Sequence, residues 1–130
     1  MIVLCDTLAP VRTEATDTGA FVVAADLALE DGVDPASVGA AVTVELCGHW
    51  EHPGPCRWPH NNEIEVGRGA ARFRTLFVAD RYEEPAVRTR IEDALRGGSG
   101  WNVLSVTSRP VAADERRLAE SLLAGPRRAA

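Results

Sequence analysis

The segment that most constrains the fold of this chain runs from Cys47 to His60 and reads Cys-Gly-His-Trp-Glu-His-Pro-Gly-Pro-Cys-Arg-Trp-Pro-His. It holds five of the chain's six histidines and cysteines, and only Cys5 lies outside it. Three prolines and two glycines within residues 48–59 prevent a long helix or strand there. The segment is therefore predicted to be a loop that something other than regular structure must order.

The residue types in this loop indicate a metal site. Imidazole and thiolate are the ligands that zinc and late transition metals favour, and spacings of two to four residues let a short loop surround one ion. The candidate ligands are Cys47, His49, His52, Cys56 and His60. Four of the five would complete a tetrahedral Cys2His2 or CysHis3 set. We predict zinc, with another divalent transition metal as the alternative, and metal binding would then contribute to folding.

Such an ion has two possible roles, and the sequence leaves open whether the chain is an enzyme. A catalytic ion keeps one position for water, with Glu51 as general base and Arg57 as a charge clamp for a small anionic substrate. Trp50 and Trp58 would then line the pocket. A structural ion is closed by four side chains, and the loop then presents these tryptophans and Arg57 to a protein partner. We favour the binding or accessory role over a metal-dependent hydrolase, lyase or cyclase.

Two further interpretations of the loop need no metal. The loop can be a polar surface segment whose tryptophans cover a sheet edge, or Cys47 and Cys56 can form a disulfide or a redox-responsive thiol pair. The first residues lack the basic region and long apolar run of a signal peptide, so we expect a cytoplasmic protein with reduced thiols. Three cysteines, an odd number, also fit a disulfide framework poorly.

Charge and composition exclude some partners. The formal net charge is -5 with no lysine in the chain, which argues against nucleic-acid or acidic-membrane binding. No stretch approaches the roughly 18 apolar residues of a membrane span. With 130 residues, 45% of them hydrophobic, the chain is expected to form one globular domain over residues 1–126, followed by a flexible tail at 127–130.

Hydrophobic periodicity predicts the regular elements. Strands are expected at 20–29 and 40–47, the second because Val42, Val44 and Leu46 alternate onto one face. Strand patterns at 64–66 and 73–78 flank two glycines that indicate a hairpin or a bulge. The acidic start Glu83-Glu84-Pro85 and the apolar residues that follow at intervals of four predict a helix that ends at Gly97-Gly98. An interior strand over 101–108 and a helix over 112–124 follow, the latter with Leu118 and Leu122 inward. The sequence also allows an additional strand at residues 2–5.

This order predicts an α+β fold. A β-α-β unit between residues 73–79 and 101–108, joined to antiparallel strands, suggests a two-layer sandwich with two helices, ferredoxin-like or a related plait. The metal-binding loop would be inserted between two strands. Because so short a chain leaves sheet edges uncovered, a homo-oligomer is also possible.

Overall fold

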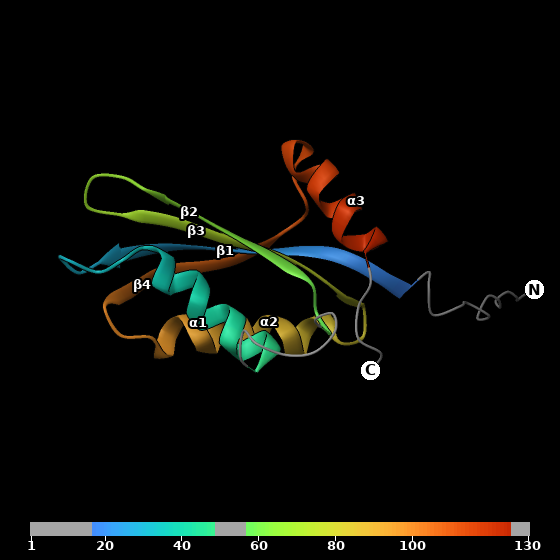
Figure 1. Ribbon diagram of the computed structural model, residues 1–130, viewed down its shortest axis with the longest axis horizontal. Coiled ribbons are helices and arrows are strands. Elements are labelled where there is room, and N and C mark those ends of the chain that lie inside the picture. The colour runs from blue at the N-terminus through green and yellow to red at the C-terminus, as the bar shows by residue number, and fades with distance from the viewer. Residues whose placement is uncertain (1–16, 49–56, 126–130) are drawn as a thin grey trace, which may run out of the picture.

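The computed structural model describes residues 17–48 and 57–125, shown as coloured ribbon in Figure 1. Its elements are, in chain order, β1 (Thr18–Leu29), α1 (Ala36–Cys47), β2 (His60–Val66), β3 (Ala71–Asp80), α2 (Glu84–Gly97), β4 (Trp101–Arg109), the 3-10 helix η3 (Ala113–Glu115) and α3 (Arg116–Ala124). The expected strand at 2–5 and the tail at 127–130 lie outside these ranges. No helix in the described part of the chain is long and apolar enough to cross a membrane.

The four strands form one antiparallel sheet in the order β2-β3-β1-β4. Since β1 pairs antiparallel with both β3 and β4, those two strands run parallel with β1 between them. In the same way β1 and β2 run parallel with β3 between them. Helices α1 and α2 therefore belong to two β-α-β crossovers, each of which skips a strand. The predicted α+β class and the crossover through α2 are confirmed.

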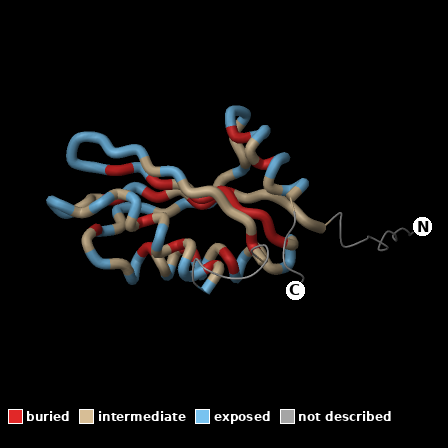
Figure 2. The backbone as a smooth tube through the Cα atoms, viewed as in Figure 1, coloured by how far each residue is buried: buried red, intermediate tan, exposed pale blue. Residues whose placement is uncertain are grey.

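Helices α1 and α2 cover one face of the sheet and close the main core there (Figure 1). Alternate residues of β1 and β3 point into this core, among them Leu27, Phe73 and Phe77. The helices contribute residues spaced by four, which are Val38, Val42 and Leu46 from α1 and Val87, Ile91 and Leu95 from α2. Figure 2 shows the buried residues gathered between the sheet and these helices. Burial of this apolar surface is the main stabilising contribution.

The opposite face of the sheet is only partly covered. Helix α3 packs there, with Leu118 and Leu122 against Val22 and Leu76. The prediction that these two leucines face inward is confirmed. The predicted sandwich of two layers and two helices is therefore incomplete. Helix α3 adds a third layer over part of the sheet, and α1 is a helix that the sequence pattern did not predict.

The strand predicted over residues 40–47 is wrong, because this segment belongs to helix α1. Val42, Val44 and Leu46 fit a strand alternation, yet Val38, Val42 and Leu46 also fit helical spacing, and these last three are the buried residues. Val44 is 49% exposed. Asp34 starts the helix by accepting the backbone N–H of Ala36 at 3.0 Å. The loop after residue 47 therefore joins a helix to a strand, not two strands.

Strand β4 lies at the edge of the sheet, so its predicted interior position is also wrong. Its register against β1 shifts between Asp26 and Leu27, where Leu104 is the extra residue of a β-bulge. The bulge lets both Val103 and Val106 pack against the main core, while Leu104 is 60% exposed. The extra residue thus explains why apolar residues occur at both odd and even positions of this strand, the pattern that suggested an interior strand.

The other predicted elements are present, although their bounds differ: β2 and β3 are longer than the predicted 64–66 and 73–78, and α3 begins at Arg116 and not at 112. Strands β2 and β3 form a hairpin in which the N–H of Gly67 donates to the carbonyl of Ala70 at 2.8 Å, and Gly69 has a positive φ of 79°. Helix α2 ends where the indole of Trp101 donates to the carbonyl of Leu95 at 2.8 Å. A Cβ on Gly98 would lie 2.0 Å from that indole, so glycine is required there.

Candidate functional site

Most of the loop that the sequence singles out lies outside the described residues. This applies to His49, Trp50, Glu51, His52 and Cys56. The structure describes the candidates that flank them, namely Cys47, Arg57, Trp58 and His60. Within residues 17–48 and 57–125, no three His, Cys, Asp or Glu side chains are grouped so that they could hold a metal ion.

Cys47 is the last residue of α1 and is disulfide-bonded. The chain's other two cysteines, Cys5 and Cys56, both lie outside the described ranges, so the disulfide partner of Cys47 lies outside them too. Metal ligation requires the thiolate, so the sulfur of Cys47 is available to a metal only after reduction. The disulfide state and the metal-bound state of this residue therefore exclude each other.

His60, the first residue of β2, uses both ring nitrogens in hydrogen bonds. Nδ1 lies 3.0 Å from the carbonyl oxygen of Trp58, and Nε2 lies 3.0 Å from the hydroxyl oxygen of Thr43 on α1. A carbonyl only accepts, so the network assigns the proton to Nδ1 and leaves Nε2 to accept from Thr43. Burial lowers the pKa of His60, and the hydrogen bond to Trp58 opposes this in part. The imidazole is thus held neutral, between a helix and the loop.

The neighbouring Asn62 extends this network along α1. Its side-chain nitrogen donates to the carbonyl of Gly39 at 3.0 Å and to the hydroxyl of Thr43 at 3.2 Å. A Cβ on Gly39 would lie 3.2 Å from the side chain of Asn62, so the small residue allows this close approach. The network therefore attaches β2 directly to α1.

Arg57 and Trp58 attach the same end of the loop to α2. The guanidinium of Arg57 donates to the carboxylate of Glu83, which precedes α2, and the indole of Trp58 lies 3.4 Å from the same carboxylate. The Trp58 ring is stacked by two guanidinium groups, Arg57 at 4.7 Å and Arg90 at 5.4 Å from its centroid. Trp58 is only 8% exposed. The Trp58 ring therefore faces the protein, which differs from the outward presentation expected for a partner, whereas the side chain of Arg57 is 39% exposed.

Sequence reasoning missed the residues that hold these flanks. Glu83 is interpretable from sequence only as an acidic helix start, and Thr43 was assigned to a strand. Their partners lie 26 and 17 residues away in the chain, and no local pattern indicates such pairs. The i, i+4 spacing of Val38, Val42 and Leu46 was the one signal that would have placed Thr43 on a helix.

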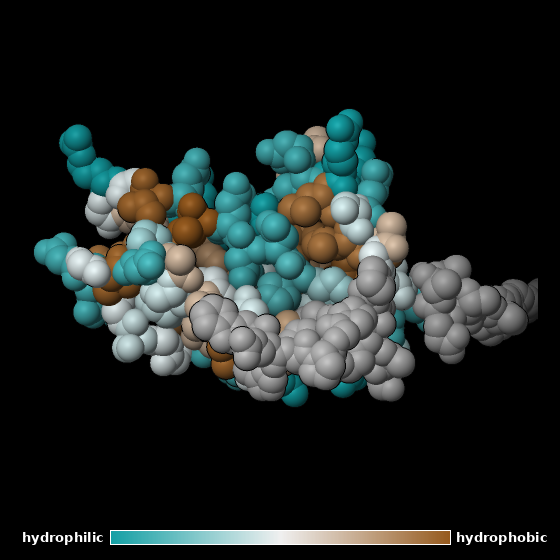
Figure 3. Space-filling view, viewed as in Figure 1, coloured by the Kyte–Doolittle hydropathy of each residue, from teal (hydrophilic) through white to brown (hydrophobic). Residues whose placement is uncertain are grey.

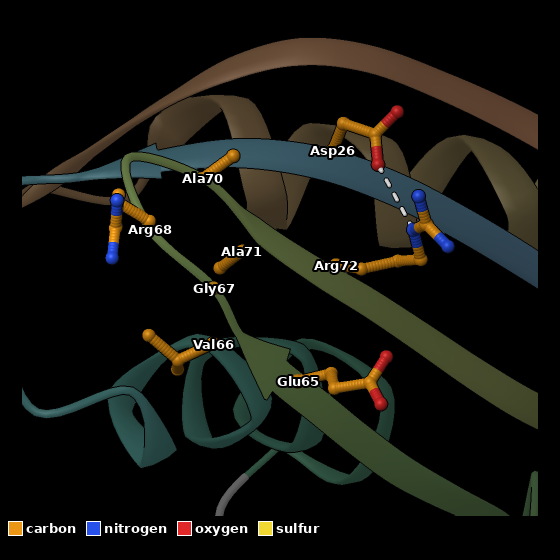
Figure 4. Close-up of a pocket in the computed structure, with 8 residues that line it drawn as sticks. All are labelled: Asp26, Glu65, Val66, Gly67, Arg68, Ala70, Ala71 and Arg72. Carbon is orange, nitrogen blue, oxygen red and sulfur yellow. Dashed lines mark ion pairs between the residues drawn. The ribbon is translucent and has the colours of Figure 1, made fainter.

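A second candidate lies on the face of the sheet that α3 leaves open. Three hollows adjoin one another on this face, and Arg72 lines all three of them. The outer one, of about 460 Å³, lies at the β2–β3 hairpin and is lined by Val66, Gly67 and Arg68 among others (Figure 4). The two inner hollows measure about 340 and 220 Å³ and share Ala24, Arg72 and Arg109. We call the inner two the trough. Figure 3 shows hydrophilic side chains over the surface between the hairpin and α3.

An ion-pair network closes the end of the trough nearest α3. Glu115 accepts two hydrogen bonds from Arg109, at 2.8 and 2.9 Å, and one from the backbone N–H of Ala112 at 2.9 Å. Its carboxylate also lies 3.0 Å from the guanidinium of Arg74. The hydrogen bonds from Arg109 and Ala112 lower the pKa of Glu115 to about 2, although burial opposes them. This network fixes η3 and the start of α3 to the sheet.

The chain matches no protein-family model and no curated protein sequence.

Proposed function

We propose that the chain is a binding or accessory domain whose loop at residues 48–59 holds a divalent metal ion, with zinc as the first choice. The observation that carries this proposal is the attachment of the loop at its flanks. His60, Arg57 and Trp58 fix one end to α1 and α2, and Cys47 forms the end of α1 on the other side. A loop attached in this way needs little further ordering to converge on an ion.

The hydrogen bonds of His60 make it the least favourable of the five candidate metal ligands. Because both of its ring nitrogens have protein partners, ligation by His60 would cost one of those hydrogen bonds. The other four candidates, Cys47, His49, His52 and Cys56, make a complete Cys2His2 set once the cysteines are reduced. A closed set of four protein ligands supports a structural ion, and hence a binding role over catalysis. The cytoplasm, where we expect the protein, would supply the reduced state.

The experiment measures zinc stoichiometry and cobalt absorption of the purified protein in the presence and absence of reductant. We expect one zinc per chain when reduced, and a cobalt derivative with tetrahedral and thiolate-to-metal bands. The double variant His49→Ala/His52→Ala should lose the metal. His60→Gln is the matched control and should retain it.

Three outcomes would change the proposal. A metal-free protein under reducing conditions would remove the metal-binding role. Loss of metal in His60→Gln would return His60 to the ligand set. A cobalt spectrum with one thiolate and a bound solvent would favour the metal-dependent enzyme, in which case Glu51→Gln should reduce turnover while metal content stays intact.

The topology supports a more specific fold class. We infer a ferredoxin-like plait, because the element order β-α-β-β-α-β with two crossovers that each skip a strand is the arrangement of that class. The terminal α3 is an addition to it. Since this class hosts many unrelated activities, the fold carries no functional assignment by itself.

A further inference from the structure

The trough on the free face of the sheet is open because of where α3 packs. Helix α3 lies over Val22 and Leu76, and the trough begins beyond them. Its floor is made of small side chains, Ala24 together with Ser105 and Thr107 of β4. Small residues on the floor leave space that no other part of the described chain fills.

The arginines of the trough are all paired within the protein. Arg74 lies 3.1 Å from Glu63 and 3.0 Å from Glu115, and Arg109 makes the bidentate contact with Glu115. Arg72 turns toward Asp26, at 3.6 Å, as the dashed line in Figure 4 shows. These guanidinium groups therefore offer little free positive charge to an anionic ligand.

Two carboxylates of the trough, in contrast, have no ion pair within the described part of the chain. These are Glu65 at the end of β2 and Asp114 of η3, which both line the hollow of about 340 Å³. The trough as a whole has five carboxylates, those of Asp26, Glu63, Glu65, Asp114 and Glu115, against three guanidinium groups. Its field therefore favours a cationic occupant.

We propose that the trough binds an extended peptide segment of a partner protein that carries an arginine or lysine side chain. The cation lies over Ala24 between Glu65 and Asp114, and Arg68 in the outer hollow disfavours a cation at the hairpin end. An extended segment fits because the hollows adjoin one another across all four strands and stay open to solvent, whereas a small molecule is usually enclosed. The proposal uses no residue of the metal loop and is independent of metal binding.

The experiment measures fluorescence anisotropy of a labelled Ala-Thr-Arg-Thr-Ala peptide with the full chain, at low and at moderate salt. The test variant is Glu65→Gln/Asp114→Asn, whose native side chains are exposed and unpaired, so the fold should be retained. The control variant is Glu30→Gln/Asp93→Asn, which removes the same two charges from exposed positions that line no part of the trough. Circular dichroism checks that both variants are folded.

We expect the test variant to bind the peptide about tenfold more weakly, since each partly exposed ion pair contributes a modest amount. The control should stay within about twofold, and added salt should weaken wild-type binding. A peptide with neutral citrulline in place of arginine should bind as weakly as the variant does.

Three results would overturn the proposal. Equal affinities of the test and control variants would remove the carboxylates as the binding groups. Binding of acetyl-arginine amide as tight as that of the peptide would make the trough a site for small cations. Sedimentation that shows wild-type self-association, lost in the test variant only, would assign this face to a second copy of the chain.

Discussion

The two faces of the sheet are built from the same strands but differ in what covers them. The face under α1 and α2 is closed by apolar side chains, and residues such as Phe77 and Ile91 have no exposed surface. The face under α3 has a small apolar contact around Val22 and Leu76, and beyond it charged side chains. Alternation along β1 and β3 separates the two sets, because successive side chains point to opposite faces.

One face therefore holds most of the buried apolar core, and the other leaves charged side chains open to solvent. An apolar core tolerates few polar groups, and at its edge both ring nitrogens of His60 and the side-chain nitrogen of Asn62 are hydrogen-bonded. The free face instead keeps charges in reach of water and fixes α3 to the sheet by the Glu115 network.

The largest effect is expected from removing a large side chain of the closed face. Phe77→Ala should lower the free energy of unfolding by about 4 kcal/mol, because it leaves a cavity in a closed core. Leu118→Ala on the α3 side should cost only about 1 kcal/mol, since this leucine is partly exposed and the site can collapse. Urea denaturation followed by circular dichroism measures both, and equal losses would contradict the comparison.

The next effect concerns the network that fixes α3. Glu115→Gln should lower the free energy of unfolding at pH 7 by about 2 kcal/mol, because two arginines lose their shared carboxylate. The folded-state pKa of Glu115, about 2, lies below its ordinary value of 4.5. Its contribution is therefore complete above pH 4.5 and is lost as pH falls toward 2.

Urea midpoints of wild type and Glu115→Gln should thus converge between pH 4.5 and pH 2. Asp93→Asn is the control and should leave the wild-type pH profile unchanged, because Asp93 is exposed on α2 and has no ion pair within the described residues. A constant difference between wild type and Glu115→Gln across this range would show that the carboxylate is not held ionised by Arg109.

Most of the fold was predictable because most of its patterns were unambiguous. The apolar, partly β-branched run of β1 indicated a strand, and the spacing of Val87, Ile91 and Leu95 indicated helix α2. The glycines at 67 and 69 indicated either a hairpin or a bulge, and the structure shows the hairpin. Helix α1 was missed because its valines fit both a period of two and a period of four, and only burial against the sheet decides between them. The edge position of β4 was hidden by a bulge that no local pattern indicates.

The candidate site was predictable in composition and not in its contacts. A concentration of His and Cys between prolines is visible in any sequence, and the prediction of zinc follows from ligand chemistry alone. The Arg57–Glu83 and Thr43–His60 contacts depend on how α1 and α2 lie beside the sheet. The trough could not be anticipated either, because its charged residues come from all four strands and η3.

The smallest predicted effect concerns His60, a polar group at the edge of the closed face. Its pKa is lowered from 6.5 by burial, so the unfolded chain binds a proton more readily than the folded chain does. The stability that His60 contributes is therefore present above pH 6.5 and is lost as pH falls through the lower folded-state pKa. His60→Gln should cost about 1 kcal/mol at pH 7.5, through its hydrogen bond with Thr43, and the cost should shrink toward pH 5. NMR titration of the His60 ring checks the cause directly, and a pKa at or above 6.5 would mean that burial against α1 does not hold the imidazole neutral.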